Sequence, residues 1–187
     1  MQAANTLASS TDAPTWEVVR AAFRDVHGSH LHGFALLLTL GDQPVAARIA
    51  AQALADGAER AGELRHPERA AAWLRARTLR YARRERRAAG DPRDGALTEL
   101  GADDRVGIAL GVLGLRARAA LIASDIERLD QRDVSTIVGI DGAGMHRMVQ
   151  RSRTRYADAF AANAGDEAVQ EGPLGTRIRM AADRALR

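Results

Sequence analysis

The segment VSTIVGIDGAGMHRMVQRSRTRY, residues 134–156, places three glycines between an apolar run and a series of arginines. Glycines in this position either hold a phosphate with their backbone N–H groups or turn the chain between two helices. A phosphate loop follows a buried strand, with glycines at a fixed spacing and often a lysine. The residues before Gly139 lack strand alternation, the spacing fits neither GxGxxG nor GxxxxGK[ST], and the chain contains no lysine. The phosphate loop is therefore disfavoured.

The same segment fits a helix-turn-helix better. This motif needs a small residue in its first helix, a glycine at the corner and apolar residues on both sides. Ser135 and Gly139 supply the first two, and Asp141 is placed to cap the second helix. The apolar contacts would come from Val134, Val138, Ile140, Met145 and Met148. An ordinary helical hairpin with a solvated arginine face remains the alternative.

The composition indicates a folded, all-α protein. Of 187 residues, 46% are hydrophobic and 27% charged, which is too apolar for a disordered chain. Only 4% are aromatic, and the abundance of alanine, leucine and arginine favours helices over strands. The absence of cysteine excludes disulfides and thiolate metal sites. The net charge of +3 does not by itself predict a nucleic-acid partner, but the arginines cluster at residues 75–87 and 147–155.

Hydrophobic periodicity and breaker residues predict two small helical bundles joined by a linker. We expect a first bundle over residues 14–88, with helices near 15–26, 30–40, 44–62 and 67–87. A linker rich in glycine, proline and aspartate covers residues 89–100. The helix-turn-helix domain covers residues 101–160, with helices near 103–113, 115–129, 130–138 and 141–160, and a tail over 161–187 ends in a short helix.

Other classes of protein find little support. The longest apolar run, residues 33–41, is too short to span a bilayer, and the first fifteen residues do not resemble a signal peptide, so we expect a cytoplasmic protein. His27, His30 and His32 lie close together, but the last two cannot share a helical face and no carboxylate follows at ligand spacing. No nucleophile or base pattern accompanies the acid pairs. We expect no metal, no cofactor and no enzymatic activity.

Residues 113–160 resemble the C-terminal DNA-binding region of bacterial RNA polymerase sigma factors, of the extracytoplasmic-function type. The matching positions are Leu113, Arg116, Leu121, Asp125, Leu129, Asp133, Val134, Gly139, Ile140, Arg151 and Arg153. Residues 23–54 resemble the first two helices of the family's other conserved region, with its GDxxxA corner at Gly41, Asp42 and Ala46. Residues 67–87 resemble the family's promoter-melting helix, with its Trp-Leu pair at Trp73 and Leu74.

The resemblance implies a transcription initiation factor that binds promoter DNA and directs core RNA polymerase, with an anti-sigma protein as a further partner. In the second helix of the helix-turn-helix, the residues expected at the DNA are Asp141, Gly142, Ala143, His146, Arg147, Gln150, Arg151 and Arg153. The basic helix would face promoter DNA with Arg75, Arg77, Arg80, Arg83 and Arg84. Trp73 and Tyr81 are candidates for stacking on bases, although a tryptophan in an amphipathic helix more often belongs to the core.

The chain departs from the family at the positions that engage polymerase. After the GDxxxA corner, Ala47, Arg48 and Ala51 replace a Glu-Asp pair and a glutamine, so Arg48 reverses a charge. Positions 77 and 80 are arginines where an apolar residue and an asparagine are usual. The alternative function is therefore a diverged sigma-like regulator that binds DNA or protein and no longer engages core polymerase.

Overall fold

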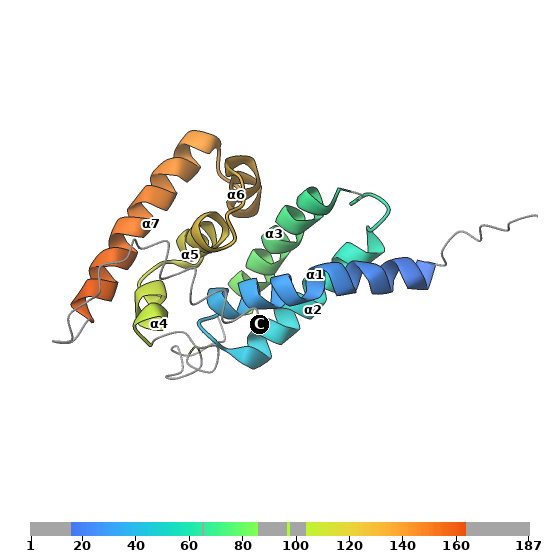
Figure 1. The fold of residues 1–187 in the computed structure, drawn as a ribbon, viewed down its shortest axis with the longest axis horizontal. Coiled ribbons are helices and arrows are strands. Elements are labelled where there is room, and N and C mark those ends of the chain that lie inside the picture. The colour runs from blue at the N-terminus through green and yellow to red at the C-terminus, as the bar shows by residue number, and fades with distance from the viewer. Residues whose placement is uncertain (1–15, 65, 86–96, 98–103, 164–187) are drawn as a thin grey trace, which may run out of the picture.

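The computed structural model describes residues 16–64, 66–85, 97 and 104–163. Within these residues every regular element is helical (Figure 1), so the all-α prediction is confirmed for the described chain. The elements are α1 (Trp16–Leu38), α2 (Gln43–Glu59), α3 (Pro67–Glu85), α4 (Asp104–Gly111), α5 (Leu115–Leu121), a π-helical turn η2 (Ile122–Ile126), α6 (Gln131–Val138) and α7 (Gly142–Ala162). None of the described helices is long and apolar enough to cross a membrane. Thr15, the tail helix and the linker 89–100 apart from Leu97 lie outside the described residues.

The two helices expected over residues 15–40 are one continuous helix, α1, so that boundary was wrong. Gly28 lies inside it, and a glycine there costs only about 1 kcal/mol relative to alanine. Packing outweighs this cost, because α2 contacts α1 and a Cβ at Gly28 would lie 3.9 Å from Leu54 of α2. The carboxyl-terminal end of α1 is enclosed by neighbouring helices, and residues 33–38 are all buried.

Helices α1, α2 and α3 pack on one another as the first half of the molecule. The connection between α1 and α2 turns through Leu40 and Gly41, which both have positive φ, and the Asp42 carboxylate then accepts a bond from the Val45 N–H at 3.1 Å. The closest approach is at Gly57 of α2, where a Cβ would lie 2.7 Å from Leu74 and 2.9 Å from Phe23. Glycine at this position lets α2 lie against both neighbours.

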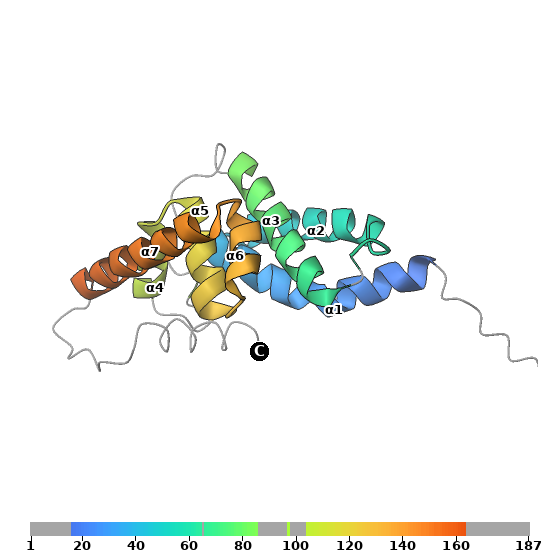
Figure 2. The same cartoon turned by 90° about the horizontal axis from the view of Figure 1, so that it is seen from above.

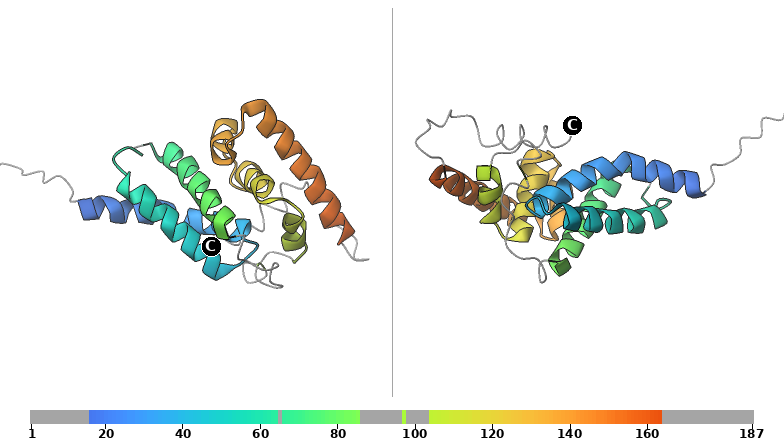
Figure 3. Two further views of the ribbon diagram at one scale, coloured as in Figure 1. Left: turned by 180° about the vertical axis from the view of Figure 1, so that it is seen from behind. Right: turned by 90° about the horizontal axis from the view of Figure 1, so that it is seen from below.

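The second half contains α4 to α7, with α7 as its longest helix (Figures 1 and 3). Helix α7 packs across α4 and α5 and also contacts α6. Tyr156 lies at the centre of this packing with none of its surface exposed, and its ring stacks on Phe160 at a centroid distance of 5.9 Å.

The two halves contact each other through a shared apolar core. Helix α3 lies against α6 and α5, and α1 reaches α5 and η2 (Figures 1 and 2). A buried ion pair crosses this seam: Arg75 of α3 donates from Nε and Nη2 to Glu127, at 2.5 and 2.6 Å. Division into two independently folding domains stays a prediction.

Arg118, which is as buried as Arg75, holds the ends of two helices together. Arg118 is only 6% exposed. Its guanidinium donates to the carbonyl oxygens of Leu38 at 2.7 Å, Leu110 at 2.9 Å and Leu113 at 3.1 Å. Carbonyls at helix carboxyl termini lack intrahelical donors, and buried ones must find a donor elsewhere. One α5 side chain thus completes the ends of α1 and α4, which belong to different halves.

We predict that Arg118→Met lowers the free energy of unfolding by roughly 2–4 kcal/mol, because buried carbonyls lose their donor. Urea denaturation measures the change, with Arg132→Met as the control because Arg132 is exposed on α6. Equal stability of the two variants would contradict this role for Arg118.

Candidate nucleic-acid interface

The turn between α6 and α7 has the local geometry that we predicted from residues 134–156. Gly139 ends α6 in the left-handed conformation, with φ of 66°, and its N–H bonds to the carbonyl of Ser135 at 2.8 Å. The Ile140 N–H bonds to the same carbonyl at 3.3 Å. Asp141 then caps α7, because its Oδ1 accepts from the Gly144 N–H at 2.8 Å. The chain therefore leaves one helix and starts the next within three residues.

The glycines of this segment have structural roles. A Cβ at Gly144 would lie 2.7 Å from Ile140 and 2.9 Å from the Asp141 carboxylate, so only glycine fits under the cap. Gly139 supplies the left-handed corner. A helix, not a strand, precedes them, which agrees with the exclusion of a phosphate loop.

The apolar residues expected between the two helices lie at their contact. Val134, Val138 and Met145 are buried, and Ile140 and Met148 are partly buried against the core. This packing fixes α7 on α6 and leaves the opposite face of α7 in solvent.

The exposed face of α7 consists of the residues predicted to face outward. Ala143, His146, Arg147, Gln150 and Arg151 are exposed. The Arg151 Nε donates along the helix to the Arg147 carbonyl at 3.3 Å. Within the described part of the chain, neither of these two arginines has a carboxylate partner. Two guanidinium groups one helical turn apart are thus available for an anionic ligand.

Two other predicted residues of this helix are less available. Gly142 is partly buried, and its carbonyl accepts from Gln131 Nε2 at 3.3 Å. Arg153 turns inward and forms a two-point ion pair with Asp125, at 2.8 Å from Nε and 2.5 Å from Nη2. The hydrogen bond to Asp125 raises the pKa of Arg153 further above its ordinary value. Arg153 therefore joins α7 to η2.

On α3, the expectation that Arg75 faces outward is wrong. Its side chain is buried because the helix lies against the second half, where Glu127 neutralises it. Arg77 is also paired, with Asp56 of α2, which accepts a 2.6 Å bond from the Tyr81 hydroxyl as well. Burial alone would raise the pKa of Asp56, but the bonds from Tyr81 and Arg77 outweigh burial and lower it.

The remaining predicted arginines of α3, Arg80, Arg83 and Arg84, are exposed. The two aromatic candidates have partners inside the chain. Trp73 is partly buried against the core, and the guanidinium groups of Arg60 and Arg77 each lie 5.4 Å from its ring centroid. Base stacking by Trp73 would have to displace these contacts.

The histidine segment forms no metal cluster: among the described residues, no group of three or more His, Asp or Glu side chains is placed to hold a metal ion. His27 instead packs on Phe23 at a ring distance of 4.6 Å. Burial, then the charges of Arg75 and His30, lower the pKa of His27, so its ring is neutral at pH 7.

Sequence reasoning missed the buried role of Arg118. An arginine four residues after Gly114 in an amphipathic helix carries no signal that distinguishes it from an exposed one. Only the convergence of three carbonyls from α1, α4 and the turn after α4 shows why it is inside.

Comparisons with models of known protein families, with curated proteins and with solved structures found no match to this chain.

We predict that Gly139→Ala lowers the free energy of unfolding by about 1–2 kcal/mol, because a left-handed backbone is strained for an L-residue. No atom lies within 4 Å of the added Cβ, so the loss of stability comes from backbone strain and not from a steric clash. Gly139→Asn should lose less, since asparagine tolerates this region. Urea denaturation of both variants tests the corner, and equal losses for alanine and asparagine would count against it.

Proposed function

We propose that this chain is a sigma-factor-like protein that binds promoter DNA and directs core RNA polymerase to it. The main support is the exposed face of α7, where Arg147 and Arg151 have no carboxylate partner in the described chain. The left-handed turn at Gly139 holds this helix against α6. In this proposal α6 and α7 form a helix-turn-helix, and α7 is the helix that enters the major groove.

The side chains divide into two roles. Arg147 and Arg151 carry full positive charge and lie one turn apart, which suits contacts to phosphates along one strand. His146 and Gln150 alternate with them on the same exposed face and carry donors and acceptors that can read base edges. Asp141, Gly142 and Ala143 form the amino-terminal turn of α7, where the backbone lies closest to the duplex.

Ion pairs within the chain make two of the predicted DNA-binding arginines less available to DNA. Arg153 and Arg77 are each neutralised by a carboxylate of the chain, so a phosphate would have to compete with Asp125 or Asp56. Arg80, Arg83 and Arg84 carry no such partner among the described residues and remain candidates on α3.

A diverged regulator without polymerase engagement is the second candidate. It is favoured by the outer face of α2, where Ala47, Arg48 and Ala51 are exposed and no carboxylate stands at these positions. Arg48 is paired within the chain: its Nη2 lies 2.9 Å from Glu85 of α3. Glu85 therefore partly compensates the reversed charge, so Arg48 repels a basic partner less than an isolated arginine would.

We predict that the double variant Arg147→Ala and Arg151→Ala weakens binding to a short mixed-sequence DNA duplex and reduces the salt dependence. Each phosphate contact contributes about 0.9 to the slope of log K against log salt, so the slope should fall by about 1.8. The control is Arg24→Ala with Arg69→Ala, which removes the same charge from exposed positions on α1 and α3. Equal slopes for the two double variants would contradict the assignment of the DNA face to α7.

Run-off transcription separates the two candidate functions. The chain, mixed with bacterial core RNA polymerase and a library of promoter fragments, should copurify with the polymerase and start transcripts at specific sites. The Arg147→Ala, Arg151→Ala variant should copurify but lose specific starts. DNA binding without copurification would establish the regulator in place of the initiation factor.

A further inference from the structure

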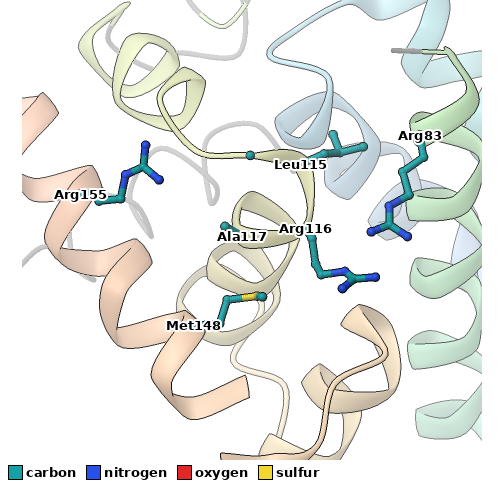
Figure 4. A pocket seen from close by; sticks show the side chains of 7 residues that line it. Arg83, Leu115, Arg116, Ala117, Met148 and Arg155 are labelled. Atoms are coloured by element: carbon teal, nitrogen blue, oxygen red, sulfur yellow. The ribbon is translucent and has the colours of Figure 1, made fainter. Parts of the chain in front are cut away.

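A pocket of about 430 Å³ opens between α3, α5 and α7, away from the ion pairs described above (Figure 4). Its rim carries three arginines from three helices, Arg83, Arg116 and Arg155. Its floor is apolar, formed by Leu115, Ala117 and Met148. No carboxylate stands among its lining residues.

The arginines of this pocket are poorly neutralised. Arg83 and Arg116 point toward one another from α3 and α5 (Figure 4), and neither has a carboxylate partner in the described residues. The Arg116 Nε is buried and lacks a hydrogen-bond acceptor in the structure. Arg155 donates to the backbone carbonyl of Val112 at 3.0 Å and has no carboxylate partner among the described residues.

The guanidinium group of arginine is permanently charged, so a site formed by two arginines keeps its positive charge. Two facing guanidinium groups and a buried, unsatisfied N–H therefore favour a bound anion. The planar donor fork of arginine matches the oxygens of a phosphate in particular.

The apolar floor and the volume of the pocket indicate the size and chemistry of the anion that fits it. Ligand pockets of about 300–1,000 Å³ typically combine apolar walls with a few placed polar groups. A bare phosphate would leave the apolar floor uncovered. A nucleotide covers it with its base and sugar while the arginines take the phosphate.

We propose that this pocket binds one nucleotide unit, with the phosphate between Arg83 and Arg116 and the base on Leu115, Ala117 and Met148. The unit comes either from a free nucleoside diphosphate or from a single strand of nucleic acid. Because Arg83 belongs to the first half and Arg116 to the second, the ligand bridges the seam between them. The site shares Arg83 with the DNA contacts proposed on α3 and shares no residue with the proposed α7 face, so the Arg116→Gln variant separates this proposal from the proposed function.

Calorimetric titration of the full chain at constant ionic strength tests it. The probes are ADP, GDP and UDP, a short oligo-dT strand, adenosine and inorganic phosphate. We expect a nucleoside diphosphate or the strand to bind more tightly than either adenosine or phosphate. Binding of free nucleotides identifies the first source, and binding of the strand alone identifies the second.

Arg116→Gln should weaken this binding by about tenfold or more, since it removes charge-assisted bonds. Arg83→Gln should do the same, and because Arg83 is exposed it tests the site even if Arg116→Gln disturbs folding. Arg69→Gln, an exposed arginine on the same helix as Arg83, is the matched control and should bind as the unsubstituted chain does.

The bridging position gives a second readout. Saturating ligand should raise the melting temperature of the unsubstituted chain and of Arg69→Gln, but not that of Arg83→Gln. The proposal is overturned if neither nucleotides nor the strand bind, if phosphate binds as tightly as the nucleotides, or if Arg83→Gln and Arg116→Gln leave binding unchanged. None of these outcomes bears on DNA binding by Arg147 and Arg151, which is measured separately.

Discussion

The buried guanidinium of Arg118 is the constraint on which the arrangement of the helices depends. Leu38, Leu110 and Leu113 are buried at or near the ends of α1 and α4, so their carbonyls need a donor within the protein. A single side chain from α5 satisfies Leu38, Leu110 and Leu113 at once. Because these carbonyls come from both halves, the position of α5 is fixed relative to α1, and α7 follows because it packs on α5.

All 27 Lys or Arg positions of the protein are arginines, and ion pairs with acids determine which of these charges remain unpaired. Arg75, Arg77 and Arg153 are paired with Glu127, Asp56 and Asp125, and they hold helices together. Arg147 and Arg151 have no such partner in the described chain and face solvent. A planar, permanently charged side chain can hold helices together or face solvent, and the carboxylates and carbonyls that surround it decide which of the two a given arginine does.

Two of the arginine surfaces without carboxylate partners in the described chain differ in shape. The face of α7 is a convex helix surface, as a groove of duplex DNA requires. The pocket with Arg83 and Arg116 is concave and has an apolar floor, as a small planar ligand requires. The two surfaces meet on α7, since Met148 of α7 lines the pocket while Arg147 beside it faces outward. A ligand in the pocket would therefore contact the helix that carries the proposed DNA face.

The sequence by itself determined the all-helical character of the described chain, the corner at Gly139 and the cap at Asp141, because each depends on local periodicity or on the backbone of one residue. It also determined which side of α7 is exposed, since helical spacing places Met145 and Met148 inward and Arg147 outward. Tertiary structure alone decided the continuity of α1 through Gly28, the burial of Arg75 and Arg118, and the pairing of Arg153. Each of these features depends on contacts with residues more than twenty positions away in the chain. The sequence around an arginine therefore does not predict which carboxylate or carbonyl it will contact in the folded protein.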